Sequence, residues 1–233
     1  MKVAIVSKSD VKKFKGILKK FGFNVVKKNP DIVLCYGGDG TVLYSERIFP
    51  GVPKIVVKKP LSVCRKCEYS IKELNYVLNS IARRDYKIVE KTKVLGIAKN
   101  KKLIGLNEVQ LHNKIPTRAI RFSIKVNGKF FGEILGDGVI ISTPFGSTAY
   151  YSSTGGRPFK KGIGISFNNP FNKKIKSIVV PENSKIEIKV IRGPAWFIAD
   201  NYEKFVELKE GDKIVVKAAK EKAKFIDIKH KSN

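Results

Sequence analysis

The first ninety residues alternate short apolar runs with amphipathic segments, and no other feature constrains the fold as strongly. The apolar runs predict strands, and three segments with apolar side chains at helical spacing predict helices. The predicted strands span 3–7, 24–26, 31–36 and 54–57, and the predicted helices span 10–21, 41–49 and 70–82. Such alternation is typical of an α/β fold, a parallel sheet with flanking helices.

Beyond about residue 86 most of the chain consists of short β-rich runs separated by turn residues. Asn127-Gly128, between two alternating runs, predicts a two-residue hairpin. The further predicted strands span 94–98, 103–105, 108–112, 120–126, 130–135, 139–142, 177–180, 185–190 and 213–218. We therefore expect an α/β domain over residues 1–90, a mostly antiparallel all-β domain over 91–218, and a tail over 219–233 that packs back on the first domain.

The chain of 233 residues is strongly basic, with a formal net charge of +27. The excess is spread along the sequence, with 20 basic against 8 acidic residues before residue 92 and 27 against 12 from there on. A field of this sign favours polyanionic partners such as nucleotides, polyphosphate or nucleic acid. Scarce Met and Trp, at one residue each, favour a heat-adapted source, whereas frequent Asn argues against one.

At 42% hydrophobic residues, a chain of this length can bury a core without disulfides or structural metals. No apolar run is long enough to span a bilayer, and the N-terminus lacks the pattern of a secretory signal. We therefore expect a cytoplasmic protein without membrane contact.

Three cysteines, Cys35, Cys64 and Cys67, are too few for a disulfide scaffold. Cys64-Arg65-Lys66-Cys67 has metal-ligand spacing, but a four-ligand zinc site needs two more partners. We expect a solvated loop that carries two thiols, rather than a metal site or a redox pair, and we assign no metal-ligating residue.

A glycine-rich turn follows the strand predicted over 31–36, and it combines Gly37, Gly38 and Gly40 with Asp39 and Thr41. Glycines let a backbone approach a phosphate, and the amides of a helix start point at it. A carboxylate beside phosphates is unfavourable unless it accepts a hydroxyl proton or holds a metal. The alternative is a tight turn in which Asp39 or Thr41 caps the helix. No G-x-x-x-x-G-K-[ST] pattern occurs in the sequence, so a P-loop is excluded.

Two further stretches carry polar side chains at the ends of predicted strands. Asn107-Glu108 enters a strand and taken alone fits exposed turn residues. The stretch Asp137–Tyr150 is an apolar strand followed by a loop rich in hydroxyls and glycine, with Ser147 opening a short helix that ends at Gly155-Gly156. Such a loop suits ribose and base recognition, although a capped strand–loop–helix would look the same.

Together these motifs resemble the ordered signature of the NAD kinase family. The family pattern is Gly-Gly-Asp-Gly-Thr, then Asn-Glu, then a long Asp-Gly to Ser-Thr-Ala-Tyr motif followed by a Gly-Gly pair. Here the motifs stand at Gly37–Thr41, Asn107-Glu108, Asp137–Tyr150 and Gly155-Gly156. The resemblance covers essentially the whole chain, and the first motif alone is shared with lipid kinases of the same superfamily.

The resemblance implies phosphorylation of the adenosine-ribose 2′-hydroxyl of NAD, giving NADP. It implies that Asp39 is the catalytic proton acceptor and that Gly37, Gly38, Gly40 and Thr41 form the phosphate loop. It further implies NAD, ATP or polyphosphate as partners, Mg²⁺ accompanying the phosphoryl donor, and a homo-oligomer, either a dimer or a tetramer. The NAD-binding residues implied are Asp39, Gly40, Asn107, Glu108, Asp137, Thr148, Ala149, Tyr150, Tyr151, Ser152 and Ser153.

The chain departs from the family pattern on the side expected to bind the phosphoryl donor. After the strand at 54–57 most members continue with a glycine-rich segment, where this chain has Lys58–Cys64. We expect Lys58 and Lys59 to neutralise donor phosphates, or else to be part of a solvated loop. Near the end, Asp200-Asn201-Tyr202 stands in place of the family's Asp-Gly-Gln.

Two alternatives have different chemistry. A kinase of the same superfamily that acts on a lipid or another small alcohol would use only the first motif, but no amphipathic membrane-surface segment is present. A basic nucleic-acid-binding protein would explain the charge, but no nucleic-acid-binding signature occurs and we expect no specific nucleic acid.

Overall fold

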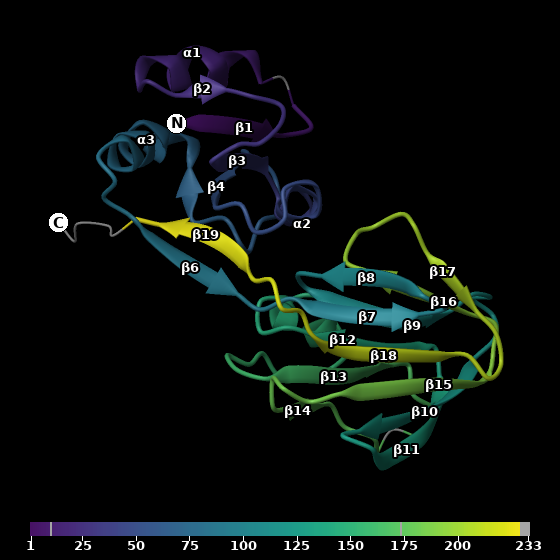
Figure 1. Cartoon of the computed structure of the whole chain (residues 1–233). Coiled ribbons are helices and arrows are strands. Elements are labelled where there is room, and N and C mark those ends of the chain that lie inside the picture. Colours follow the sequence, from purple (N-terminus) through teal and green to yellow (C-terminus); the bar gives the residue numbers. More distant parts are fainter. Residues whose placement is uncertain (10, 173, 229–233) are drawn as a thin grey trace. The chain divides into compact units, whose positions relative to one another are not determined.

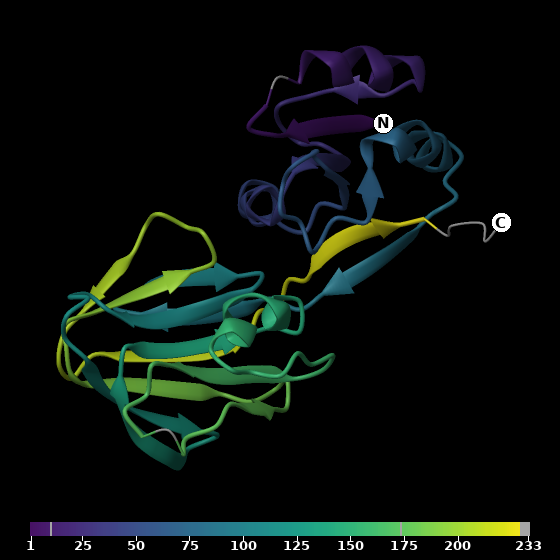
Figure 2. The ribbon, with the colours of Figure 1, turned by 180° about the vertical axis from the view of Figure 1, so that it is seen from behind.

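The computed structural model describes residues 1–9, 11–172 and 174–228, which form two compact units. The first unit contains Met1–Lys91 together with the segment that starts at Lys222, and the second contains Thr92–Glu221. Figures 1 and 2 show the ribbon from opposite sides, coloured along the sequence. The first unit contains one sheet and the second contains two, and each unit has its own hydrophobic core.

The first unit is built on a seven-stranded, mostly parallel sheet. Its strand order is β2-β1-β3-β4-β19-β6, with β5 pairing with β4. Neighbours β1, β3 and β4 run parallel, whereas β6 runs antiparallel to β19. The strands are β1 (Lys2–Val6), β2 (Asn24–Val25), β3 (Ile32–Gly37), β4 (Lys54–Lys58), β5 (Tyr69–Ser70), β6 (Lys87–Lys91) and β19 (Ala223–Asp227).

Helices cover both faces of this sheet, because successive side chains of a strand point to opposite faces. Leu34 of β3 lies in a core cluster with apolar side chains of α1 and α3. The next residue, Cys35, points the other way, and its thiol donates a hydrogen bond to Ser45 Oγ of α2 at 3.0 Å. The helices are α1 (Lys12–Lys20), α2 (Asp39–Ile48) and α3 (Leu74–Ala82), the last preceded by the 3-10 turn η1 (Ile71–Glu73).

The second unit contains two six-stranded antiparallel sheets. Their orders are β11-β10-β15-β18-β7-β8 and β14-β13-β12-β9-β16-β17. The first sheet consists of β7 (Val94–Ala98), β8 (Lys101–Gly105), β10 (Ile120–Val126), β11 (Lys129–Gly136), β15 (Ile186–Arg192) and β18 (Lys213–Ala218). The second consists of β9 (Glu108–Asn113), β12 (Gly138–Ser142), β13 (Ile163–Asn168), β14 (Ile178–Val180), β16 (Ala195–Ala199) and β17 (Val206–Leu208).

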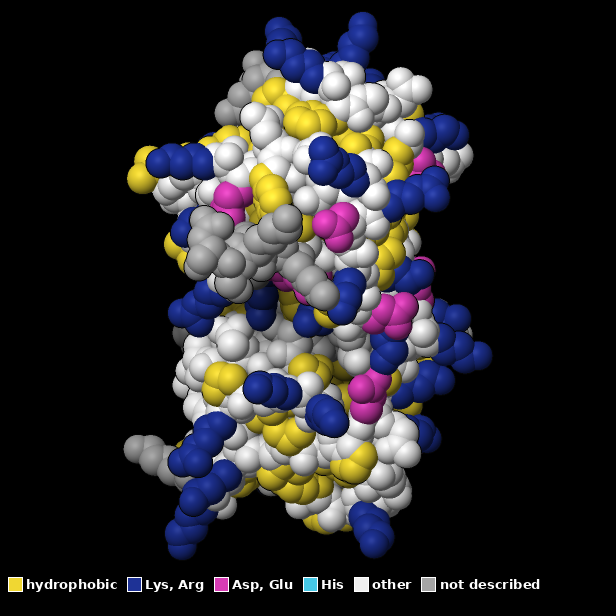
Figure 3. Space-filling view, turned by 90° about the vertical axis from the view of Figure 1, so that its left-hand side faces the viewer, with side chains coloured by type: hydrophobic (Ala, Val, Ile, Leu, Met, Phe, Trp, Pro, Cys, Tyr) yellow, Lys and Arg dark blue, Asp and Glu magenta, His cyan; other side chains and the backbone are white. Residues whose placement is uncertain are grey.

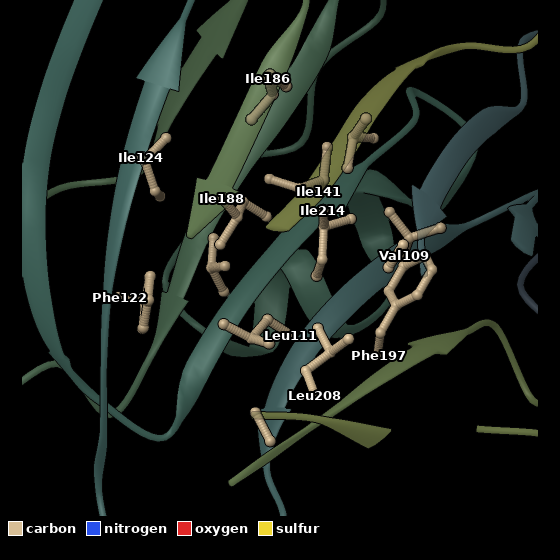
Figure 4. Close-up of a cluster of buried hydrophobic side chains, with 14 of the residues drawn as sticks. Val109, Leu111, Phe122, Ile124, Ile141, Ile186, Ile188, Phe197, Leu208 and Ile214 are labelled. Carbon is tan, nitrogen blue, oxygen red and sulfur yellow. The ribbon is translucent and has the colours of Figure 1, made fainter. Parts of the chain in front are cut away.

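One hydrophobic cluster contains side chains from both sheets of the second unit, and Figure 4 shows its centre. Phe122 and Ile188 come from the first sheet, and Leu111, Ile141 and Phe197 come from the second, all of them essentially without solvent exposure. Burial of apolar area on this scale is the main force that holds the two sheets together.

The structure confirms the predicted fold class, an α/β part followed by a mostly antiparallel β part. The hairpin at Asn127-Gly128 is also confirmed: Val126 pairs with Lys129, and both turn residues have positive φ, 50° and 80°. In the part of the chain that the structure describes, no helix combines the length and apolarity needed to cross a membrane.

Some elements differ from the sequence prediction. Helix α2 begins at Asp39, two residues earlier than expected, so Asp39 lies in its first turn. Strands β5, β6, β13, β16, β17 and β19 were not predicted, and β19 is formed by residues of the expected tail, of which 229–233 lie outside the described residues.

Candidate active site

The glycine turn joins the carboxyl end of β3 to the start of α2. Gly37 is the last residue of β3, and Gly38 caps α2 with an extended backbone (φ −109°, ψ −170°). A Cβ at Gly38 would lie 2.6 Å from the carbonyl oxygen of Val63, so no other residue fits there without a backbone shift. Ligands of open α/β sheets bind at the carboxyl ends of the strands, and a helix N-terminus favours anions. The turn therefore brings a carboxylate, that of Asp39, to an anion-binding position.

The half-buried carboxylate of Asp39 accepts hydrogen bonds from the backbone of the loop that follows β4. The amide of Arg65 donates to Oδ2 at 3.2 Å, and the amide of Lys66 donates to Oδ1 at 3.0 Å. The amide of Asp39 itself donates to the carbonyl oxygen of Val63 at 3.4 Å. The loop that replaces the family's glycine-rich segment therefore lies directly on Asp39.

The cysteines of this loop form a disulfide, Cys64–Cys67, so the expectation of two free thiols was wrong. Their Cα atoms are 5.5 Å apart, within the range that a disulfide requires. Cys64 Sγ lies 3.3 Å from Asp39 Oδ1, a contact without a proton because the sulfur is oxidised. Among the described residues, no three His, Cys, Asp or Glu side chains gather in a way that would hold a metal ion.

Asn107 and Glu108 lie at the start of β9, and both are buried, with 6% and 1% of their surface exposed. The interpretation of the pair as exposed turn residues is therefore wrong. Within the described part of the chain, Asn107 Oδ1 has no hydrogen-bond partner, and Glu108 Oε1 accepts a bond from Gln110 Nε2 at 3.4 Å. Buried polar atoms are normally satisfied, so the Asn107 oxygen is a candidate for ligand contact.

Two residues outside the expected site hold the backbone of this pair in place. The carboxylate of Asp200 accepts amide hydrogen bonds from Leu106, Asn107 and Glu108 at 2.8, 2.8 and 3.1 Å. Thr143 donates its amide to the Asn107 carbonyl and its hydroxyl to the Leu106 carbonyl, at 2.8 and 2.7 Å. Thr143 lies within the long motif and Asp200 at the family's Asp-Gly-Gln position, so both had a signal in the sequence, although neither was assigned a role.

The loop after β12 carries the rest of the long motif. It forms the 3-10 turn η2 (Gly146–Thr148) and the short helix α4 (Tyr150–Ser153). Ser147 is buried and fastens the turn by donating its hydroxyl to the Pro144 carbonyl at 2.8 Å. Thr148, Ala149 and Ser152 are half-buried, and Tyr150 and Ser153 are exposed. Five of the six residues from Thr148 to Ser153 thus have surface available for a ligand.

Tyr151 is the exception in this loop, because only 1% of its surface is exposed. Its ring packs edge-on against Phe159, with centroids 5.2 Å apart, and a Cβ at Gly156 or Gly164 would collide with it. Burial raises the pKa of its phenol, so the group stays protonated. Tyr151 therefore anchors α4 and offers a ligand almost no surface.

Asp137 lies apart from the Asn-Glu pair, at the opposite end of β12. Glu108 pairs with Ser142 at one end of this strand, whereas Gly138, next to Asp137, pairs with His112 at the other. The two ends are four residue steps apart along the strand, which is about 14 Å. Asp137 accepts hydrogen bonds from Asn169 and Asn113 side chains at 2.7 and 3.4 Å, which hold that end of the strand.

Comparisons with known proteins extend the motif evidence to the whole chain. Residues 106–228 match the family model of the ATP-NAD kinase C-terminal domain. The NAD kinase of Thermoplasma volcanium is 32% identical over 214 residues, which cover 89% of this chain and 78% of that protein. The chain belongs to the NAD kinase family.

A second relative, the bifunctional NADP phosphatase/NAD kinase of Methanococcus maripaludis, is 32% identical over 83% of this chain. The match covers only 36% of that protein, so the chain spans about a third of its length. Among solved structures, an NAD kinase from Archaeoglobus fulgidus in complex with ATP has the same fold, with a TM-score of 0.85 and 24% identity over 97% of this chain and 93% of that one.

Membership confirms the activity indicated by the motifs, that of an NAD kinase. Neither a lipid kinase nor a nucleic-acid-binding protein is favoured by these similarities.

Proposed function

We propose that this member of the NAD kinase family transfers a phosphoryl group from ATP or polyphosphate to the 2′-hydroxyl of the adenosine ribose of NAD, with Asp39 as the proton acceptor. The observation that supports the role of Asp39 is its place in the first turn of α2, directly after the glycine turn. There a carboxylate and the anion-binding end of a helix lie within one residue of each other.

The reaction needs the ribose hydroxyl and the donor phosphate to be held in line, and it needs a group that accepts the hydroxyl proton. A ribose hydroxyl is too weak an acid to ionise near neutral pH, so a carboxylate within hydrogen-bond reach takes its proton as the new bond forms. The 2′-oxygen bonds to the terminal phosphorus of the donor, the bond from that phosphorus to the departing phosphate oxygen breaks, and the hydroxyl proton passes to Asp39. Gly37 and Gly38 in the glycine turn, and Gly40 and Thr41 in the first turn of α2, approach the donor phosphates.

We assign binding of the dinucleotide to residues of the second unit. Asn107 and Glu108 supply buried polar side chains, and Asp200 and Thr143 hold the backbone of this pair. Thr148, Ala149, Tyr150, Ser152 and Ser153 supply contacts from the loop after β12, with Tyr151 acting through packing. Asp137 contributes to the same function from the other end of β12.

The phosphoryl donor brings its own divalent cation. Mg²⁺ bound to ATP or polyphosphate neutralises charge as the terminal phosphate is transferred, and it is part of the substrate complex. Lys58, the last residue of β4, and Lys59, which follows it, are both exposed and add positive charge beside the glycine turn, since Lys58 pairs with Gly37. The relative from Archaeoglobus fulgidus was solved with ATP, which supports ATP as one donor. Since NAD and ATP are intracellular metabolites, we place the enzyme in the cytoplasm. The resemblance to the family further leads us to propose a homo-oligomer.

The test is NADP formation from NAD and Mg²⁺, with ATP and polyphosphate assayed in parallel, for the wild type and Asp39→Asn. Loss of a positioned proton acceptor lowers the rate by about 10² to 10⁴-fold, whereas NAD binding measured by calorimetry stays close to that of the wild type. The matched control is Asp31→Asn, an exposed carboxylate just before the same strand β3. Undiminished turnover by Asp39→Asn would remove this residue from the mechanism.

A further inference from the structure

The loop Val63–Cys67 makes hydrogen bonds with two groups of Asp39, its carboxylate and its backbone amide. Both groups lie where the proposed reaction takes place. Asp39 accepts the amides of Arg65 and Lys66 on its two carboxylate oxygens, at 3.2 and 3.0 Å. Its own amide, at the start of α2, donates to Val63 O at 3.4 Å. A substrate hydroxyl must come within about 2.6–3.2 Å of the accepting oxygen, the distance that the loop amides hold here.

The disulfide closes this same loop. Cys64 and Cys67 enclose Arg65 and Lys66, and both sulfurs lie on the glycine turn: Cys64 Sγ is 3.3 Å from Asp39 Oδ1, and Cys67 Sγ is 3.6 Å from Gly37 O. Closing a short loop covalently removes conformational freedom that an open chain would regain. The ring thus favours the arrangement in which two successive amides converge on one carboxylate.

The two cysteines are suited to reversible chemistry. Both are half-buried on an irregular loop and so are within reach of a small dithiol. Disulfides of intracellular proteins are typically transient or redox-sensing, with heat-adapted organisms as the exception.

We propose that the Cys64–Cys67 disulfide is a reversible redox site that restrains the kinase, because it holds the loop Val63–Cys67 on Asp39 until a dithiol reductant opens it. The proposal rests on the role of Asp39 stated above. A thiolate of the reductant attacks one sulfur of the disulfide, which forms a mixed disulfide and releases the other cysteine as a thiolate. The second thiol of the reductant then attacks its own sulfur in the mixed disulfide and releases the remaining cysteine. Cys64 and Cys67 gain two electrons and two protons, and the reductant becomes a disulfide.

The third cysteine does not take part. Cys35 is fully buried on β3, where its thiol donates to Ser45 Oγ, and burial raises its pKa to about 11. A thiol held in this protonated form is a poor nucleophile. Alkylation of the folded protein therefore reports on Cys64 and Cys67 alone.

The experiment compares the full chain in two states, oxidised with diamide and reduced anaerobically with dithiothreitol that is then removed. Alkylation followed by mass spectrometry counts modified cysteines, and NADP formation is measured with saturating NAD and donor. We expect no labelled cysteine in the oxidised state and two in the reduced state. The turnover number rises about tenfold or more on reduction and falls again on reoxidation. A change of this size is expected if about a tenth of the oxidised molecules, but nearly all of the reduced ones, have the loop away from Asp39.

Three controls make the result specific. The double variant Cys64→Ser/Cys67→Ser has the turnover of the reduced wild type in both states, and Cys35→Ser retains the wild-type response. Hydrogen exchange of the peptide spanning residues 60–68 rises on reduction in the wild type and is high in the double variant in both states. This last measurement reports loop release without any use of activity.

The outcomes separate the redox proposal from the proposed function. NADP formed equally by both states, or a disulfide that dithiothreitol does not open in the folded protein, overturns the redox proposal and leaves the kinase function standing. Hydrogen exchange that is the same in both states overturns it as well. No NADP from either state overturns the proposed function, and the redox proposal fails with it.

Discussion

Outside the proposed catalytic group, Asp200 is the residue whose hydrogen bonds most directly predict the result of a substitution. Its carboxylate accepts three successive backbone amides, those of Leu106, Asn107 and Glu108, and its own amide donates to the Glu108 carbonyl at 3.1 Å. Bonds from amides to a charged acceptor are roughly twice as strong as neutral ones. Under the proposed function Asp200 is therefore a positioning residue, which would act on the dinucleotide through the backbone of the Asn-Glu pair.

We expect Asp200→Asn to raise the KM for NAD while leaving the KM for ATP unchanged. The amide side chain replaces an acceptor oxygen by a donor that faces backbone amides, and loss of hydrogen bonds to a charged group costs about 1.5–3 kcal/mol. If that loss is expressed in NAD binding, the KM rises about 10- to 100-fold. Steady-state kinetics with each substrate varied in turn measures the effect, with thermal unfolding as a check on folding.

The matched control is Asp212→Asn. Asp212 also accepts a backbone amide, that of Lys209 at 2.6 Å, and pairs with Lys99, but it lies in the turn before β18. Its variant should leave both KM values unchanged. Equal effects of the two variants on KM would show that Asp200 acts only through general stability.

At the residue scale, the position of Asp39 could be predicted from the sequence, whereas its contacts could not. The place of Asp39 after a strand follows from the order of apolar and glycine residues, because strand ends and helix starts leave a pattern. The contacts of Asp39 with Arg65 and Lys66 leave no pattern in the sequence. They involve backbone amides 26 and 27 residues away and do not depend on side-chain type. The same holds for the amides that bind Asp200.

At the scale of elements, β19 is the least predictable part of the fold. Its sequence, Ala-Lys-Phe-Ile-Asp, is short and flanked by lysines, and it fits a solvated tail as well as a strand. In the structure it lies between β4 and β6, with a parallel contact from Phe225 to Lys54, a partner 171 residues earlier. Pairing at such separation leaves no local pattern, whereas the local hairpin at Asn127-Gly128 was predicted correctly.

We expect Ile226→Ala in β19 to destabilise the first unit strongly. Ile226 is 1% exposed and belongs to the core cluster of that unit, so its truncation creates a cavity that costs about 2–5 kcal/mol. The control is Ile88→Ala, because Ile88 of β6 is the direct cross-strand partner of Ile226 but is 45% exposed. Its loss should cost below about 1 kcal/mol. Urea unfolding of both variants checks the difference, and equal free energies of unfolding would place β19 outside the stable core.

At the scale of the whole molecule, the charge is a property of both units and not of one site. Figure 3 shows Lys and Arg side chains scattered over the visible face, among hydrophobic and acidic ones, with no single basic patch. The net charge of +27 produces a long-range positive potential that raises the local concentration of anions. Polyphosphate carries many more negative charges than NAD, and ATP with its Mg²⁺ still carries more than NAD, so the charge should act mainly on the donor.

We therefore expect salt to raise the KM for ATP several-fold more than the KM for NAD. Between ionic strengths of about 0.01 M and 0.15 M the screening length falls from about 30 Å to about 8 Å, which removes the contribution of distant charges. Two double variants separate near from far lysines: Lys58→Gln/Lys59→Gln beside the glycine turn, and Lys125→Gln/Lys189→Gln on exposed positions of β10 and β15. The first should raise the KM for ATP at both ionic strengths, and the second only at the lower one. The concentration of free Mg²⁺ is held constant throughout. If salt raised the KM for ATP and the KM for NAD equally, the charge would serve stability or solubility instead of donor binding.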